Sequence, residues 1–132
     1  MFVHLVWATW DRRPLLAPEI RNRVYRCIQA EAHRLGCEVY AIGGIEDHVH
    51  VLVRFVPTVS VAELVKQVKG ASSRLVQTEI RAWEFFKWQG SYGAFTIAAN
   101  QIEPVRRYIH NQAEHHRTGN LYRALERTDA ET

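Results

Sequence analysis

The sequence predicts an α+β domain in which helices cover an antiparallel sheet. Apolar segments rich in β-branched residues alternate with segments of helical spacing, in the order strand, helix, strand, strand, helix, strand, strand, helix. Only two glycines separate the second and third expected strands, and so short a connection requires antiparallel neighbours. With 132 residues, 47% of them apolar and 23% charged, the chain has the size and composition of one globular domain. We therefore expect a single domain over residues 1–132, with a short C-terminal tail from about residue 120.

The first strand and first helix are marked by their ends. Residues 2–10 are mostly apolar and stop at a basic turn that Pro14 closes. Pro18 stands where a helix is expected to open, because the missing N–H of a proline costs nothing in the first turn. Apolar residues then recur at helical spacing until Gly36, a residue typical of the position after a helix end.

The third strand carries a pair of histidines. Residues 37–42 are expected to form the second strand, and Gly43-Gly44 to turn the chain into a strand over residues 45–55. Side chains alternate along a strand, so His48 and His50 share one face and the valines between and after them share the other. Two imidazoles so placed can bind one metal ion. In a chain with seven histidines, two hydrogen-bonded strand histidines are the commoner explanation.

A second helix follows residue 60. Ser60 is expected to cap it, with Glu63 completing a capping box. Lys66, Lys69 and Arg74 project away from its apolar side. A solvated face is the usual explanation of such residues, and a surface that follows a phosphate backbone is the alternative.

The last helix carries a tyrosine and a glutamine. Residues 83–88 and 91–98 are expected to be two more strands, and a third helix is expected over residues 103–117. Tyr108 and Gln112 are four residues apart and therefore lie on one side of that helix. Taken alone, this pattern is typical of an amphipathic helix whose tyrosine packs its ring and keeps its hydroxyl in water.

Charge and cysteine content restrict the function classes. The formal charge of +3, carried mostly by arginine, favours an anionic partner such as phosphate. Cys27 and Cys37 are too few for a disulfide framework, which favours a reducing cytoplasm. No apolar run approaches the ~20 residues of a membrane span, and the N-terminus lacks the features of a signal peptide. We expect a cytoplasmic protein without membrane contact.

Three segments in a fixed order are more specific than any of them alone: the paired histidines His48-Val49-His50, residues 86–95, and residues 108–116. Together they resemble the single-tyrosine HUH transposases, the small transposases of bacterial and archaeal insertion sequences of the two-hundred and six-hundred-and-five class. Residues 4–7 and Arg12-Arg13 are also similar to that family, so the resemblance runs from about residue 3 to about residue 117. It implies the HUH endonuclease fold, a ferredoxin-like antiparallel sheet of about five strands with helices packed on it.

The resemblance also implies a site and a reaction. His48, His50 and Gln112 would bind a divalent metal, Mg or Mn, and Tyr108 would be the nucleophile. The protein would cleave and rejoin single-stranded DNA at the hairpin-marked ends of an insertion sequence, through a 5′-phosphotyrosine. A homodimer is expected, because two ends must be cut and each chain has one nucleophile. The connector over residues 98–103 would allow active sites to be shared between the chains.

Basic residues are the candidates for DNA phosphate contacts. They are Arg12, Arg13, Arg54, Lys66, Lys69 and Arg74. Two other functions remain open at this point. One is a domesticated relative that binds hairpins in a host role, and the other is a metal-dependent phosphoesterase that uses water and in which Tyr108 only packs.

Overall fold

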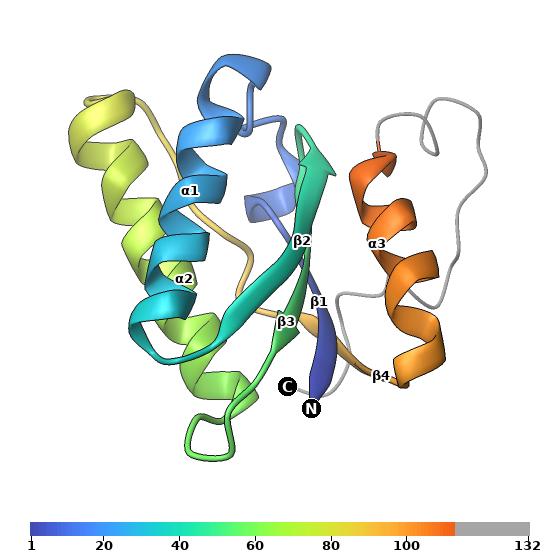
Figure 1. Cartoon of the computed structure of the whole chain (residues 1–132). Coiled ribbons are helices and arrows are strands. Elements are labelled where there is room, and N and C mark those ends of the chain that lie inside the picture. Colours follow the sequence, from blue (N-terminus) through green and yellow to red (C-terminus); the bar gives the residue numbers. More distant parts are fainter. Residues whose placement is uncertain (113–132) are drawn as a thin grey trace.

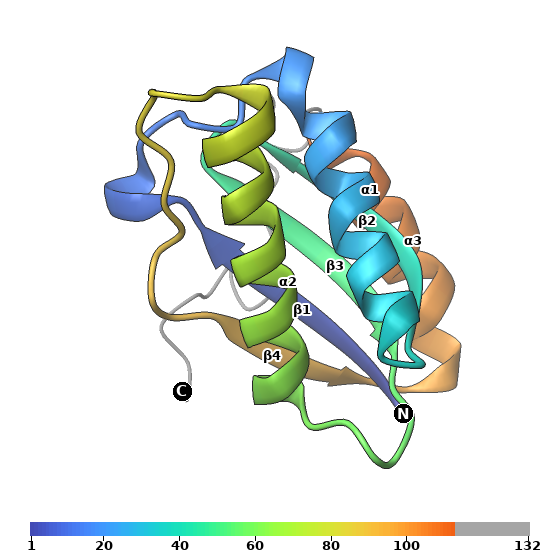
Figure 2. The same cartoon turned by 90° about the vertical axis from the view of Figure 1, so that its left-hand side faces the viewer.

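The computed structural model describes residues 1–112, and among them an antiparallel sheet has four strands in the order β2-β3-β1-β4. The strands are β1 (Phe2–Ala8), β2 (Glu38–Ile45), β3 (His48–Arg54) and β4 (Gly93–Ile97). Helices α1 (Pro18–Arg34) and α2 (Val61–Leu75) lie side by side on one face, and α3 (Ile102–His110) lies on the other (Figure 1, Figure 2). Shorter helical segments span Trp10–Arg12, Val76–Ile80 and Ala99–Gln101. The predicted α+β class, an antiparallel sheet covered by helices, is confirmed.

The helix ends that were predicted from capping residues, proline and glycine lie at the predicted positions. Helix α1 begins at Pro18, and Gly36 follows its end with φ +86°. At the start of α2 the Glu63 amide donates to the Ser60 hydroxyl at 3.1 Å, and the Ser60 amide donates to the Glu63 carboxylate at 3.4 Å. This is the expected capping box. The last helix begins at Ile102 and ends at His110, with Asn111 in a turn, so the expected unbroken helix over residues 103–117 is interrupted there. Residues 113–117 and the tail from about residue 120 lie outside the described residues.

The expected fifth strand is wrong. Within residues 1–112, the segment 83–88 pairs only through a single isolated bridge between Trp88 and Thr9. Aromatic residues favour strands in general, but here they serve packing: the Trp88 ring packs edge-on against Trp7, and its indole N–H donates to the Ser72 hydroxyl at 3.0 Å. Trp83 is fully exposed. Two backbone hydrogen bonds, from Trp10 N–H to the Lys87 carbonyl oxygen and from Gln89 N–H to the Ala8 carbonyl oxygen, make the bridge, and they do not extend into a ladder.

The expected turn at Gly43-Gly44 is also wrong. Both glycines lie inside β2, and the chain turns at Glu46 and Asp47. A Cβ on Gly43 would overlap the carbonyl oxygen of Ile109 in α3, and a Cβ on Gly44 would overlap the carbonyl oxygen of His48. A glycine inside a strand often marks such a close backbone approach. Gly43 lets the last helix lie directly on the sheet.

The alternation of side chains along the strands produces two cores of different composition, one on each face of the sheet. In β1 and β3 the odd-numbered side chains are buried under α1 and α2, and all of them are apolar. They are Val3, Leu5, Trp7, Val49, Val51 and Val53. The even-numbered residues of these strands point towards α3, where Leu52 packs with Val105 and Ile109. Both histidines of β3 are on this second face, as the alternation predicted.

None of the helices within residues 1–112 combines the length and apolar character that crossing a membrane would require.

Candidate active site

The four residues that the sequence singled out meet beneath α3. The His48 ring nitrogen Nε2 lies 3.3 Å from Gln112 Oε1, although the two residues are 64 positions apart. The Tyr108 ring stands edge-on to the His50 ring, with centroids 5.7 Å apart. The Gln112 amide also donates to the Tyr108 carbonyl oxygen at 3.3 Å. The structure therefore brings all four together within one chain.

These four side chains are buried. His48 and His50 are 0% exposed, Gln112 is 1% exposed and Tyr108 is 3% exposed. Buried polar groups are costly unless they are hydrogen-bonded, so the contacts between them are part of what holds α3 on the sheet. The tyrosine ring belongs to the apolar cluster of Leu52, Val105 and Ile109 and also packs edge-on against His50 of the pair.

Each histidine of the pair has a further partner at its Nδ1 atom, and sequence reasoning missed both. Asp47 Oδ1 lies 2.8 Å from His48 Nδ1, and His4 Nε2 lies 2.9 Å from His50 Nδ1. Asp47 was taken as a strand residue, whose side chain would point away from His48. It is a turn residue, so strand alternation does not apply. His4 could be found only from the register, which pairs it with Leu52, the residue two positions beyond His50.

The donor set fits a divalent metal ion. Ligand bonds of about 2.1 Å place two ligands of one ion roughly 3.0–3.4 Å apart, and His48 Nε2 and Gln112 Oε1 are 3.3 Å apart. With Nδ1 of each histidine held by Asp47 or His4, Nε2 is the ring atom that would serve as ligand. Among the residues that the structure describes, no group of three or more histidine, cysteine, aspartate and glutamate side chains is arranged to hold a metal ion.

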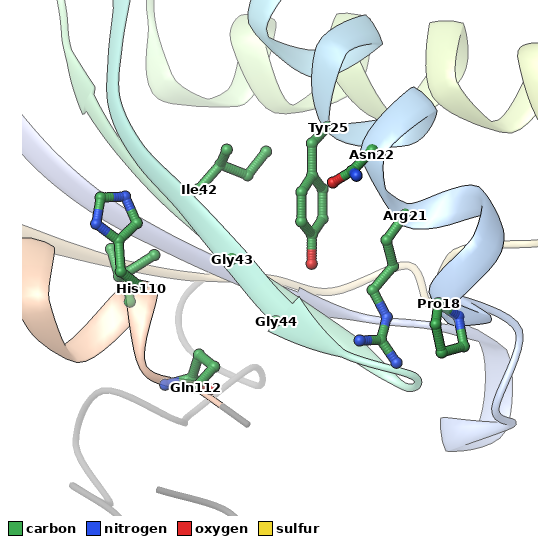
Figure 3. A pocket seen from close by; sticks show the side chains of 10 residues that line it. Pro18, Arg21, Asn22, Tyr25, Ile42, Gly43, Gly44, His110 and Gln112 are labelled. Atoms are coloured by element: carbon green, nitrogen blue, oxygen red, sulfur yellow. The ribbon is translucent and has the colours of Figure 1, made fainter. Parts of the chain in front are cut away.

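A cavity of about 270 Å³ adjoins this cluster (Figure 3). Helix α1 lines it with Arg21, Asn22 and Tyr25, β2 lines it with Gly43 and Gly44, and Gln112 belongs to its wall. Figure 3 shows the Tyr25 ring pointing from α1 towards the glycines of β2.

Two residues that line the cavity, Tyr25 and Arg21, have polar groups in restricted surroundings. The Tyr25 hydroxyl is buried and has no hydrogen-bond partner among residues 1–112, and burial raises the pKa of Tyr25 to about 12. Arg21 donates to the Leu16 carbonyl oxygen at 2.9 Å and to the Glu46 carboxylate at 3.1 Å. The cavity therefore presents polar groups directly beside Gln112.

The six basic residues do not form one surface. Two of them lie near the histidine end of the sheet: Arg12 Nε is 3.8 Å from Asp47 Oδ2, and the Arg13 guanidinium lies 4.8 Å from the centre of the Phe85 ring. Arg54 is at the other end of β3, where it is paired with Glu38.

The other three belong to α2, on the opposite face of the sheet from the histidine pair. Lys66 and Arg74 are exposed. Lys69 is half-buried and donates to the Gln89 carbonyl oxygen at 2.5 Å, and burial lowers its pKa to about 8. Lys69 therefore anchors the loop before β4 to α2. Its role as a phosphate contact stays a prediction, as do those of the other five.

A histidine–hydrophobic–histidine strand inside an antiparallel sheet, covered by a helix that carries a tyrosine and is followed by a glutamine, defines the HUH class of single-tyrosine transposases. The comparison with known families agrees: the chain belongs to the IS200-like transposase family, whose model matches residues 1–112. The resemblance inferred from the three sequence segments is confirmed.

Individual relatives support this assignment. The ISDra2 transposase TnpA of Deinococcus radiodurans is 29% identical over 114 residues, which are 83% of this chain and 81% of the relative. A crystal structure of a Deinococcus radiodurans R1 protein at 1.90 Å resolution has a TM-score of 0.67 and 28% identity, over 85% of this chain and 90% of that one. A REP-associated tyrosine transposase bound to a REP hairpin also has a TM-score of 0.67, at 11% identity, over 91% of this chain and 69% of that one. The last similarity shows a shared fold.

Proposed function

We propose that this transposase cleaves and rejoins single-stranded DNA with Tyr108 as nucleophile, at a divalent metal held by His48, His50 and Gln112. The observation that supports this most directly is the meeting of two distant elements. Helix α3 places Tyr108 against His50, and Gln112, two residues beyond the end of that helix, lies against His48. The proposed nucleophile and ligands therefore share one buried cluster in a member of a transposase family.

The reaction is a transesterification. The Tyr108 hydroxyl oxygen attacks a backbone phosphate, and the bond from phosphorus to the 3′ oxygen breaks. The phenol loses its proton, the leaving 3′ oxygen gains one, and the products are a 5′-phosphotyrosine and a free 3′-hydroxyl. One phosphodiester replaces another, so a second 3′-hydroxyl can reverse the step without a nucleotide cofactor.

The ligand set suits this chemistry. Two neutral imidazoles and an amide leave the full charge of Mg or Mn undiminished, and the ion supplies charge stabilisation to the scissile phosphate when bound. A phenol has an ordinary pKa near ~10 and attacks well only beside positive charge. Gln112 contacts both His48 and the Tyr108 backbone. It therefore couples the helix that carries the nucleophile to the ligand cluster.

The substrate we propose is single-stranded DNA that carries hairpins at the ends of an insertion sequence. A neighbour with the same fold is bound to a REP hairpin, and the cavity beside Gln112 offers polar groups next to the cluster. Arg12 and Arg13 lie near the end of the sheet that carries His48. They are therefore the basic candidates that we favour for phosphate contacts. Moving an element requires two cuts, so we propose that the working unit is a homodimer.

The decisive experiment incubates the protein with labelled single strands from both flanks of its own gene, in Mg or Mn. We expect a protein–DNA adduct that survives a denaturing gel. Tyr108→Phe should form none while still binding the strands. Tyr40→Phe is the matched control, because the Tyr40 ring packs on the same face of the sheet, edge-on to Phe2 at 4.8 Å.

Two results would contradict the proposal. Cleavage by Tyr108→Phe at the wild-type rate would mean that water is the nucleophile, as in a metal-dependent phosphoesterase. Hairpin binding without any cleavage or adduct from either flank, in either metal, would instead favour a domesticated hairpin-binding relative.

A further inference from the structure

A third histidine lies in the buried cluster, and the proposed reaction does not use it. His4 is in β1 and is 0% exposed. Its Nε2 atom lies 2.9 Å from His50 Nδ1, and the two rings are tilted by 31° with centroids 5.0 Å apart. Phe95 of β4 lies beyond it, with a ring centroid 6.1 Å away. The ring is therefore enclosed between a neighbouring strand and His50.

A histidine at this position is unexpected from packing alone. The rest of β1 from Val3 to Ala8 is apolar, and a polar ring is expensive to bury unless its hydrogen bonds are used. The contact with His50 is such a use. It uses His50 Nδ1, whereas Nε2 of that ring would serve as the ligand.

The contact restricts where protons can be. A neutral imidazole carries one N–H and one acceptor nitrogen, so in a bond between two neutral rings only one of the two facing nitrogens holds the proton. If His4 donates, His50 carries its own proton on Nε2 and cannot bind a metal through that atom. If His50 donates from Nδ1, its Nε2 is the acceptor and is competent to bind.

We propose that His4 is a positioning residue: it accepts the Nδ1 proton of His50 and so holds that ring in the tautomer and orientation that present Nε2 to the metal. This inference rests on the proposed role of His50 as a ligand. Asp47 holds His48 in the corresponding way, at 2.8 Å. Partners of this kind fix the ring and tautomer of a metal-binding histidine.

The two supports differ in charge. Asp47 is a carboxylate with a 26% exposed side chain that also faces Arg12, whereas His4 is sealed inside the sheet. A carboxylate in place of His4 would be difficult to bury there. A neutral imidazole can accept the proton without adding negative charge beside the metal.

The first test needs no variant. In metal-free protein labelled with ¹⁵N in its histidines, long-range ¹H–¹⁵N NMR spectra report the tautomer of each ring. We expect His50 as the Nδ1–H form. Finding the Nε2–H form would overturn the proposal, whatever the activity of the protein.

The second test compares two variants of His4. His4→Leu removes the acceptor at similar size, and His4→Gln keeps an acceptor oxygen. We expect His4→Leu to lose the Nδ1–H preference of His50 and to bind Mn²⁺ about 10- to 100-fold more weakly, as measured by titration with electron paramagnetic resonance. His4→Gln should restore most of the affinity. Val6→Ala is the control, because Val6 pairs with His50 in the register but offers no hydrogen bond.

The outcomes separate the two proposals. Unchanged tautomer and unchanged Mn²⁺ affinity in a folded His4→Leu protein would overturn the role of His4. If the wild type binds no Mn²⁺, the proposed metal chemistry fails, while the tautomer spectra of wild type and His4→Gln still decide the inference about His4.

Discussion

The two faces of the sheet are built from alternate residues of the same strands, yet they have opposite compositions. Under α1 and α2, Leu5, Trp7 and Val51 belong to one large apolar cluster. Under α3, the core includes buried histidines together with Tyr108 and Gln112. Apolar burial is the main favourable term in folding, whereas a buried hydrogen bond contributes only about 0.5–1.5 kcal/mol net. The comparison indicates that the first face is the main source of stability, and the second face holds the proposed site.

The largest stability effect should therefore come from the apolar face. Leu64 in α2 is 1% exposed, and Leu64→Ala should lower the free energy of unfolding by about 2–5 kcal/mol through lost burial and a cavity. Urea unfolding measures the loss. At temperatures where the variant remains folded, the Mn²⁺ affinity should be unchanged. A loss below about 1 kcal/mol would contradict the assignment of this face as the main source of stability.

A medium effect is expected where α3 approaches the sheet. Gly43→Ala places a Cβ against the Ile109 carbonyl oxygen. Neither the Cβ nor the carbonyl oxygen can move without its backbone, so α3 must move. We expect a loss of about 1–3 kcal/mol, the usual range for overpacking. Weaker Mn²⁺ binding should accompany it, because Gln112 moves away from His48.

The matched control for that substitution is Gly70→Ala. Gly70 is in α2, with no neighbour within 4 Å of an added Cβ, so alanine there should stabilise the helix by roughly 0.5–1 kcal/mol. Equal effects of the two substitutions would show that the close approach at Gly43 is unimportant.

The smallest effect concerns Lys69 in α2, one of the two helices that cover the apolar face of the sheet. Burial lowers its pKa from 10.5 to about 8, so between pH 8 and 10.5 the unfolded chain binds more protons than the folded one, and stability should rise with pH in that window. Thermal unfolding of the wild type and of Lys69→Met across this pH range measures how stability changes with pH. The variant should lack the part of the increase that comes from Lys69. An identical pH dependence in both proteins would mean that Lys69 is no more buried than an ordinary surface lysine.

Local signals in the sequence predicted a large part of the fold. The helix starts at Pro18 and Ser60 and the helix end at Gly36 involve hydrogen bonds within a few residues, so neighbouring residues suffice to place them. The alternation of β3 correctly separated His48 and His50 from the valines. These features depend on backbone geometry that repeats along an element, whatever lies around it.

The predictions from sequence were wrong where contacts with a distant element determine the local structure. Gly43 and Gly44 have the composition of a turn, but the approach of α3 explains why Gly43 is a glycine. Residues 83–88 have the composition of a strand, but Trp88 satisfies its polar atom with a side chain of α2. No local pattern contains either contact, because both join residues far apart in the sequence.

The site divides in the same way. The sequence by itself determined the residue types that could cleave DNA, the spacing of His48 and His50 and that of Tyr108 and Gln112, and the transposase family to which the chain belongs. Only the tertiary structure decided that Gln112 faces His48, that Asp47 contacts His48 and that His4 contacts His50. The physical reason is that spacing along one element follows from its own geometry, whereas contacts between elements depend on register and on how closely one backbone approaches another.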